Sequence, residues 1–327
     1  MIGPDECVAA IDLGGTKIAA ALVDAAGTIL IDRQVPTDAH GGPEAVIGRI
    51  ADLVNALAAA LGRRPAALGI GVPGLADVAR GVTRFLPNLP TQWRDVPVRE
   101  MLSPRVNCPV LVLNDARCAT LGELTFGHGR DAAAVNTMLF FTLGTGIGGG
   151  VVVDRKLRLG RLGAAGELGH QTIVPDGPRC SCGSRGCLEM LASGTAIAGE
   201  GVRLMRSGQA PKLYEIAGGD DRRVSAATMD QAARAGDAPV ADALERVGRY
   251  IGIAAANLVV AVHPDLVVFG GGVAALGETL LRPIRQTVAR GASLVPVDGI
   301  RFEVSHLGDK AGLLGAAALA LSGGVGL

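Results

Sequence analysis

The sequence predicts an α/β protein of two domains, and three observations support this. The chain has 327 residues, of which 49% are hydrophobic, which is enough for more than one core. Residues 9–24 and 139–154 share one layout, in which a glycine-rich turn separates two apolar runs. Residues 109–127 and 240–270 join strand patterns to helix patterns. We therefore expect a duplicated architecture with one glycine hairpin in each half.

Composition limits the partners of the protein. The 31 lysine and arginine residues balance the 31 aspartate and glutamate residues, so nucleic acid and anionic membranes exert little attraction. The N-terminus has no signal-peptide pattern, and the longest apolar stretch, residues 251–262, is shorter than the roughly 20 residues of a bilayer span. We expect a cytoplasmic protein that binds a small molecule, with no nucleic acid and no membrane as partner.

The first hairpin, "AAIDLGGTKIAAALVD" at 9–24, predicts a nucleotide phosphate site. Its glycines let the backbone approach phosphate oxygens, and the carboxylate at the end of the first strand suits Mg²⁺ bound through water. The candidate nucleotide contacts are Asp12, Gly14, Gly15, Thr16 and Lys17. The alternative is an ordinary buried hairpin.

The next candidates follow a loop and a short strand. Asn88 lies on a proline-bounded loop near Trp93, where an amide is typical of a turn and also suits a sugar hydroxyl. Asn114 and Asp115 fall where the strand of residues 109–127 gives way to its helix, so helix N-terminal amides favour the ionised carboxylate. Such a carboxylate can accept a proton from a sugar hydroxyl. Asp115 is the candidate general base, and a simple helix cap is the alternative.

The second hairpin, residues 139–154, contributes Gly144, Thr145 and Gly146 as further phosphate contacts. Its glycines also match the G-x-G-x-x-G dinucleotide pattern. The residues that follow, "VVVD", predict a strand where a dinucleotide-binding fold begins a helix, so we reject that fold.

The stretch "CSCGSRGC" at 180–187 predicts a metal site, because clustered cysteines in a reducing compartment more often bind metal than form disulfides. His170, Cys180, Cys182 and Cys187 complete a tetrahedral set for structural Zn²⁺. Glu167 and Glu189 flank these ligands, so one metal would brace two carboxylates suited to sugar hydroxyls. The alternative is three unpaired thiols in a loop. The other cysteines, Cys7, Cys108 and Cys118, are expected in the core.

Three segments complete the chain. Residues 208–224 are polar and predict an irregular surface excursion. After the helix pattern of 240–262, a buried strand ends at Gly270, Gly271 and Gly272, which leaves room for a base or ribose or forms a plain turn. A helix at 309–322 is expected to return to the first domain.

Taken together, these motifs resemble the ROK sugar kinases and repressors, within the sugar kinase, heat-shock protein and actin-like (ribonuclease H-like) fold group. The matching stretches are "DLGGTK", "GVPG", "PNLPTQW", "LNDA", "TLGTGIGGG", "GAAGELGH", "CSCGSRGCLE" and "VVFGGGV", in family order over most of the chain. The resemblance implies two α/β domains around an interdomain cleft, residues 1–113 plus 309–327 and residues 114–308. It also implies a homodimer or homotetramer.

The resemblance implies an ATP-dependent hexose kinase, with glucose the preferred sugar and Asp115 the base. The residues implied to bind the sugar are Asn88, Asn114, Asp115, Glu167, His170 and Glu189. N-acetylmannosamine, fructose or allose as the sugar substrate remain alternatives to glucose. Polyphosphate remains an alternative to ATP as the phosphoryl donor. A sugar-responsive repressor is the remote alternative, and the first hairpin, near residue 9, leaves no room ahead of it for a DNA-reading helix-turn-helix. Two departures stand out: Arg117 replaces the asparagine common after Asp-Ala, and Arg155 replaces a glycine after the second hairpin.

Overall fold

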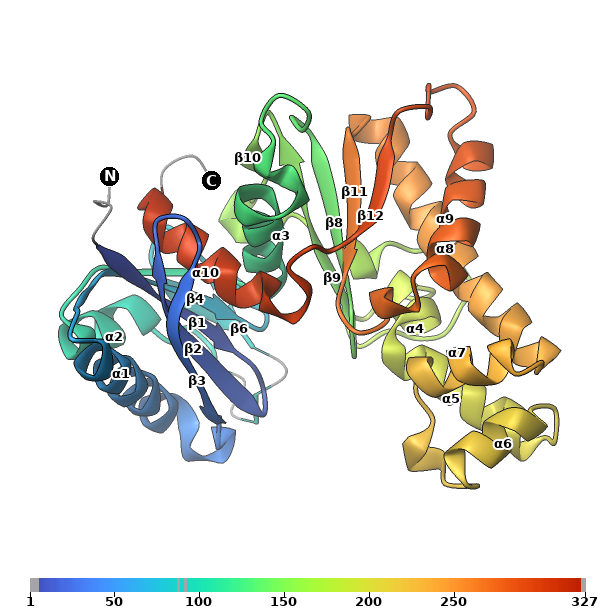
Figure 1. The fold of residues 1–327 in the computed structure, drawn as a ribbon, viewed down its shortest axis with the longest axis horizontal. Coiled ribbons are helices and arrows are strands. Elements are labelled where there is room, and N and C mark those ends of the chain that lie inside the picture. Colours follow the sequence, from blue (N-terminus) through green and yellow to red (C-terminus); the bar gives the residue numbers. More distant parts are fainter. Residues whose placement is uncertain (1–5, 87–88, 91–92, 325–327) are drawn as a thin grey trace. The chain divides into compact units, whose positions relative to one another are not determined.

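The computed structural model describes residues 6–86, 89–90 and 93–324 (Figure 1). The chain forms two compact units. The first comprises the residues up to Ala133, Gly150–Gly166 and the residues from Lys310 onward, and the second comprises Ala134–Gly149 and Glu167–Asp309. The predicted boundary falls after residue 113, whereas the first unit also includes 114–133 and 150–166.

The structure has strands and helices in mixed order. The strands are β1 (Cys7–Leu13), β2 (Lys17–Asp24), β3 (Ile29–Pro36), β4 (Pro65–Val72), β5 (Leu75–Asp77), β6 (Val82–Phe85), β7 (Val110–Asn114), β8 (Met138–Leu143), β9 (Ile147–Val153), β10 (Lys156–Leu157), β11 (Leu266–Gly270) and β12 (Arg301–Val304). The helices are α1 (Gly42–Leu61), α2 (Val98–Val106), α3 (Asp115–Phe126), α4 (Leu188–Ala192), α5 (Gly194–Arg206), α6 (Pro211–Ala217), α7 (Ala226–Arg234), α8 (Ala238–Val262), α9 (Glu278–Gly291) and α10 (Ala311–Ser322).

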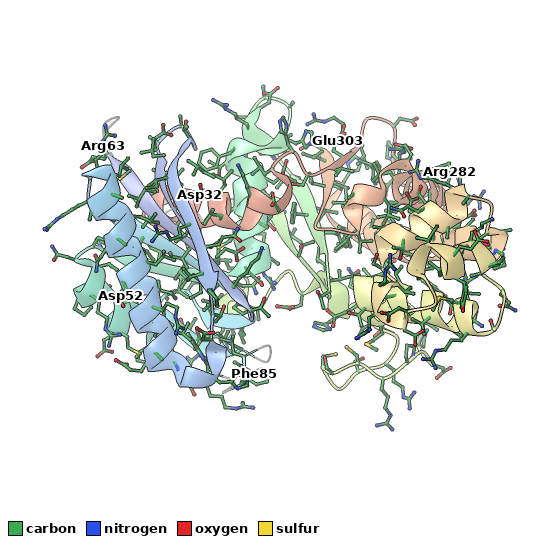
Figure 2. The ribbon with its side chains drawn as sticks, turned by 60° about the horizontal axis from the view of Figure 1, so that its bottom comes forward. Asp32, Asp52, Arg63, Phe85, Arg282 and Glu303 are labelled. Carbon is green, nitrogen blue, oxygen red and sulfur yellow. The ribbon has the colours of Figure 1, made fainter. Side chains whose placement is uncertain are left out.

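The first sheet has the strand order β3-β2-β1-β4-β7. The hairpin predicted at 9–24 is present, since β1 and β2 pair antiparallel with Ile11 opposite Ala20. β1, β4 and β7 run parallel, and helices cover both faces of this sheet, which explains why these strands are almost wholly apolar (Figure 1). In α1 the buried residues Val46, Ile50 and Val54 recur every four positions, while Asp52 points outward (Figure 2).

The backbones of α3 and α10 meet at glycines. A Cβ added to Gly315 would lie 1.6 Å from the carbonyl oxygen of Cys118, and one added to Gly122 would lie 2.5 Å from that of Ala311. Side chains at these two positions would therefore separate the helices. This contact places α3 in the first unit.

The second sheet has the order β10-β9-β8-β11-β12 and so repeats the arrangement of the first. In each sheet, an antiparallel hairpin is flanked by a third strand on one side and by two parallel strands on the other. The third strand has eight residues in the first sheet (β3) and two in the second (β10). The predicted helix at 240–262 lies within α8, and β11 ends at Gly270 as expected. The prediction of an irregular segment at 208–224 was wrong, because Pro211 begins the helix α6 there.

The structure also bears on the cysteines outside the cluster, on the C-terminal helix and on membrane-spanning segments. Cys7 and Cys118 are fully buried as expected, whereas Cys108 is only partly buried. The C-terminal helix is present as α10 and is buried along most of its length. Among the residues that the structure describes, no helix combines the length and apolarity needed to cross a bilayer.

Candidate active site

Asn114 and Asp115 share the junction between β7 and α3. Asn114 is the N-cap of α3, and its side chain accepts from the backbone N–H of Arg117 at 3.1 Å. The Asp115 carboxylate is half-buried, and its Oδ1 accepts from the Asn114 amide at 2.9 Å and from the Ala116 N–H at 2.7 Å. The capping role expected as the alternative for Asp115 thus belongs to Asn114, and hydrogen bonds orient the Asp115 carboxylate.

Asp12 lies at the same edge of the first sheet as Asp115. The strands β1, β4 and β7 are parallel, with Asp12 opposite Gly71 and Asn114 opposite Val72, so their carboxyl ends meet there. The pKa of the Asp12 carboxyl is raised by its burial, and Lys17 partly opposes this. The structure therefore brings the candidate metal-facing carboxylate and the candidate base to one end of the sheet, where open α/β sheets bind ligands.

The turn of the first hairpin is braced from both sides. The Gly14 N–H donates to the Lys17 carbonyl at 2.9 Å, which closes the turn. The fully buried Thr37 donates its hydroxyl to the Gly14 carbonyl at 2.8 Å and its backbone N–H to the Thr16 carbonyl at 2.9 Å. Both carbonyls are satisfied by the protein.

The second hairpin is tied to the start of α5. The Gly144 N–H donates to the Gly146 carbonyl at 3.0 Å, and the Gly144 carbonyl accepts from the Gly194 N–H at 2.7 Å. The Thr195 hydroxyl donates to the Thr145 carbonyl at 2.9 Å. The turn that would face phosphate is thus fixed against a helix N-terminus, a position that favours anions.

Glu189 links the second hairpin to the cysteine cluster. Its Oε2 accepts from the Ile147 N–H at 2.9 Å, and a Cβ on Gly146 would lie 2.4 Å from the same oxygen. A side chain at position 146 would therefore displace the Glu189 carboxylate. Glu189 is in the first turn of α4, whose N-cap is the predicted zinc ligand Cys187.

The four predicted metal ligands converge. The donor atoms of His170, Cys180, Cys182 and Cys187 all lie within 4.8 Å of one another. Cys182 Sγ lies 3.7 Å from Cys187 Sγ, and Cys180 Sγ lies 3.6 Å from His170 Nδ1. A zinc tetrahedron with bonds of about 2.3 Å to sulfur has edges of about 3.8 Å. The donor set and its spacing therefore fit Zn²⁺, with Nδ1 as the histidine donor.

The third glycine turn packs on the second hairpin and borders a pocket. Gly271 has φ +85°, and a Cβ there would lie 2.5 Å from the Leu143 carbonyl oxygen, which also accepts from the Val273 N–H at 2.9 Å. A pocket of about 640 Å³ opens beside it. Its lining includes the predicted residues Gly144, Thr145 and Gly272, together with Gly194, Thr195, Ala198, Val224, Ser225, Ala226, Ala227 and Val273.

The sequence interpretation missed the α5 and α7 walls of this pocket. The α7 wall begins at Ser225, which forms a capping box with Thr228. A serine followed three residues later by a threonine, ahead of an apolar pattern, is a weak form of the helix-start signature and could have indicated it. Ser193 is the N-cap of α5, and its side chain accepts from the Ala196 N–H.

The remaining predicted residues divide between the units. Asp12, the first hairpin, Asn114 and Asp115 belong to the first unit, whereas Glu167, His170 and Glu189 belong to the second. Glu167 is exposed and His170 is half-buried. Asn88 lies outside the described residues.

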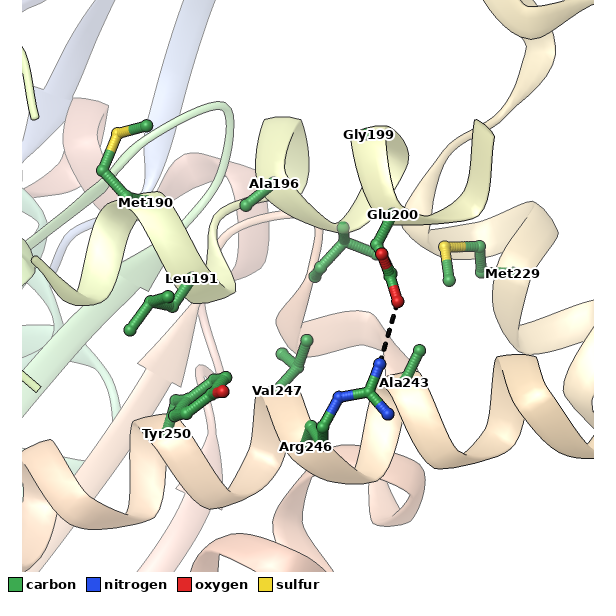
Figure 3. Close-up of a pocket in the computed structure, with 11 residues that line it drawn as sticks. Met190, Leu191, Ala196, Gly199, Glu200, Met229, Ala243, Arg246, Val247 and Tyr250 are labelled. Atoms are coloured by element: carbon green, nitrogen blue, oxygen red, sulfur yellow. Dashed lines mark hydrogen bonds and ion pairs between the residues drawn. The ribbon is translucent and has the colours of Figure 1, made fainter. Parts of the chain in front are cut away.

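A second pocket, of about 320 Å³, lies between α4, α5, α7 and α8 (Figure 3). Apolar side chains such as Met190 and Val247 line it, and Arg246 donates to Glu200 across it at 2.9 Å. It contains none of the predicted site residues.

The structure gives defined contacts to Arg117 and Arg155, the two residues that depart from the family pattern. Arg117 is 1% exposed and donates to both Asn114 and Ala165. Arg155 has φ +57°, in the region that favours glycine, and donates to the Gly129 carbonyl at 3.1 Å.

Comparison with known proteins gives one consistent result. The model of the ROK family matches residues 8–322. A glucokinase of Streptomyces coelicolor is 38% identical over 317 residues, which cover 95% of this chain and 96% of that protein. A xylose repressor of Caldicellulosiruptor bescii is 30% identical over 95% of this chain and 77% of its own length. The solved ROK family glucokinase of Streptomyces griseus, in complex with glucose and AMPPNP, has a TM-score of 0.81 at 36% identity, with 96% of this chain and 99% of that chain covered.

Proposed function

This chain belongs to the ROK family, and from that premise we propose that it is an ATP-dependent glucokinase, which converts glucose and ATP to glucose 6-phosphate and ADP. The observation that carries the proposal is its similarity, along nearly the whole chain, to glucokinases, one of them solved with glucose and an ATP analogue. The fold agrees, since each unit presents a glycine hairpin suited to phosphate.

Asp115 is the proposed general base. It would accept the proton of the attacking sugar hydroxyl while that oxygen forms a bond to the γ-phosphorus and the bond to ADP breaks. Support comes from its orienting hydrogen bonds to Asn114 and Ala116. We propose that Asn88, Asn114, Glu167, His170 and Glu189 bind the hexose. With His170 Nδ1 on the metal, Nε2 is the nitrogen that would serve a hydroxyl.

For the nucleotide, we propose that the pocket beside Gly272 receives the adenosine and the two hairpins receive the phosphates. Support comes from the pocket volume of about 640 Å³, in the usual range for small-molecule sites, and from the braced turns. Asp12 would hold Mg²⁺, which neutralises phosphate charge during transfer. Carboxylate oxygen is the donor type that Mg²⁺ prefers.

The cysteine cluster is proposed as a closed, structural zinc site. His170, Cys180, Cys182 and Cys187 supply four protein donors, so no position is left for substrate. Burial and its thiol neighbours raise the pKa of Cys187 to about 12, and a bound cation would favour the thiolate form of this residue.

Several finer points belong to the same proposal. We expect a cytoplasmic homodimer or homotetramer. N-acetylmannosamine, fructose and allose are the alternative sugars, and polyphosphate is the alternative donor. The alternative of a sugar-responsive repressor is supported by the similarity to repressors such as that of Caldicellulosiruptor bescii. That relative is lower in identity than the glucokinase, and less of its own length is covered.

A coupled ADP-release assay tests the proposal. The protein is given ATP with glucose, mannose, N-acetylmannosamine, fructose or allose, and then polyphosphate in place of ATP. Glucose with ATP should give the highest kcat/KM. Metal content is measured on the same sample and should be one zinc per chain. Absence of turnover with every sugar, together with a salt-resistant shift of operator DNA, would support the repressor instead.

A further inference from the structure

Arg117 carries a full charge in the interior of the first unit. Its side chain is 1% exposed, although arginine is almost never fully buried without partners. It lies in the first turn of α3, two residues after Asp115. Burial of a guanidinium is costly unless oxygen atoms satisfy its donors. Two such oxygens are the side-chain oxygen of Asn114 and the carbonyl oxygen of Ala165.

The first of these contacts acts together with the helix backbone to fix which way the Asn114 amide faces. Its Oδ1 accepts from the Arg117 backbone N–H at 3.1 Å and from Arg117 Nη1 at 3.0 Å. Since a guanidinium has donors and no acceptor, the amide oxygen must face Arg117. The amide nitrogen then donates to the Gly74 carbonyl and to Asp115 Oδ1, each at 2.9 Å. Arg117 thereby helps to hold the Asn114 amide, which in turn orients the carboxylate of the proposed base, Asp115.

The second contact anchors an irregular segment of chain. Arg117 Nε donates to the Ala165 carbonyl at 2.8 Å. The segment around it contains Gly160, Leu162, Gly163 and Gly166, all with positive φ, so no strand or long helix fixes its path. Ala165 lies two residues before Glu167, a proposed hexose contact.

We propose that Arg117 is a positioning residue for phosphoryl transfer. It fixes the Asn114–Asp115 pair through one hydrogen bond and the start of the segment leading to Glu167 through the other. The asparagine that the family resemblance implies at this position is shorter and uncharged. The expected effect of Arg117 on glucose phosphorylation rests on the proposed function.

The test compares three variants with the wild-type protein. Arg117→Met keeps a similar side-chain volume and removes every side-chain donor, while the backbone N–H that donates to Asn114 remains. Arg117→Lys keeps the charge with one compact ammonium. Thr120→Val is the structural control, because it removes the buried hydrogen bond from Thr120 to the Ala116 carbonyl on the same helix without touching Asn114 or Ala165. Glucose and ATP kinetics are measured separately, and hydrogen exchange is followed in the peptide covering 160–166.

For Arg117→Met we expect kcat/KM for glucose to fall by about 10²-fold, through a lower kcat and a higher glucose KM, with the ATP KM unchanged. Arg117→Lys should recover part of this loss. Exchange at 160–166 should accelerate in Arg117→Met and stay at the wild-type rate in Thr120→Val. A partly unfolded enzyme would instead lower kcat at constant KM for both substrates.

Two results would overturn the inference: wild-type glucose kinetics in Arg117→Met, or a fall in kcat alone that Thr120→Val reproduces. If Arg117→Met does not fold, Arg117→Lys decides, and an unchanged glucose KM there counts against the proposal. If wild-type protein phosphorylates no sugar, the proposed function fails, while the exchange rates at 160–166 still test the anchoring.

Discussion

At the level of single residues, the structure assigns different roles to Asn114 and Asp115, which the sequence alone did not distinguish. Asn114 caps α3, and Asp115 is left with an oriented carboxylate. From the sequence alone, either residue could have been the cap. The difference arises because only Asn114 reaches the Arg117 N–H, three residues on.

Asp115→Asn tests the base. The amide keeps the size of the side chain and cannot accept the proton, so kcat should fall by about 10² to 10⁴. Glucose binding, measured by calorimetry, should change only a few-fold. A variant that retains more than about a tenth of the wild-type rate would contradict a base of this strength.

Asp12→Asn should separate stability from function. Burial raises the pKa of Asp12, so the folded protein binds this proton more tightly than the unfolded chain does. The resulting penalty is absent below the unfolded pKa of about 4 and grows as pH rises through the higher folded value. The variant should therefore melt at a higher temperature than wild type at pH 7, with the gain shrinking toward pH 4.

The same variant should lose Mg²⁺-dependent turnover, because it lacks the proposed ligand. Thermal melts from pH 4 to 8, combined with a Mg²⁺ titration of activity, measure both effects. A gain in Tm that is constant over this range would show that the Asp12 charge is not its source.

At the level of helices and strands, local patterns predicted the hairpins, β7–α3 and α8 well. They failed for α6, a short helix in a polar stretch. Its buried residues, Leu213 and Ala217, are four apart and too few to show a period. They also failed to assign α3 to the first unit. That assignment depends on the contact between Gly122 and Gly315, which are far apart in sequence and carry no side chain that a pattern could reveal.

The α3–α10 contact predicts opposite effects for two glycine-to-alanine changes. Gly315→Ala would place a Cβ 1.6 Å from the Cys118 carbonyl oxygen, and should destabilise the protein by about 1–3 kcal/mol. Gly199→Ala, within α5, meets no atom within 4 Å outside its own helix and should stabilise by about 0.5–1 kcal/mol. Denaturant unfolding measures both. Equal effects would mean that helix propensity, and not the close approach, decides.

At the scale of the whole molecule, sequence spacing predicted the metal donors but not the contacts between distant segments. The pattern from His170 to Cys187 predicted the cluster, because its ligands lie close together in the chain. It could not predict that Glu189 would also accept from Ile147 of the second hairpin, because that contact joins residues 42 apart in sequence. Arg117 could not be placed either, since a lone charged residue is normally assigned to the surface.

Metal removal should act mainly on the second unit. Structural zinc in such loops is worth on the order of 10 kcal/mol of local folding energy. Treatment with a strong chelator, or the Cys182→Ser change, should release zinc and lower the calorimetric transition of this unit, with loss of glucose phosphorylation. Cys108→Ser, at a partly buried cysteine outside the cluster, is the matched control and should retain the metal. Unchanged melting after complete zinc loss would exclude a structural role.

The division into units also determines whether the two units can be separated by proteolysis or by recombination. The chain passes from one unit to the other after Ala133, Gly149, Gly166 and Asp309. A single scission by a protease, or one crossover between related genes, therefore cannot yield an intact half. Exchange of one whole unit for that of a relative would require new junctions at all four of these crossings.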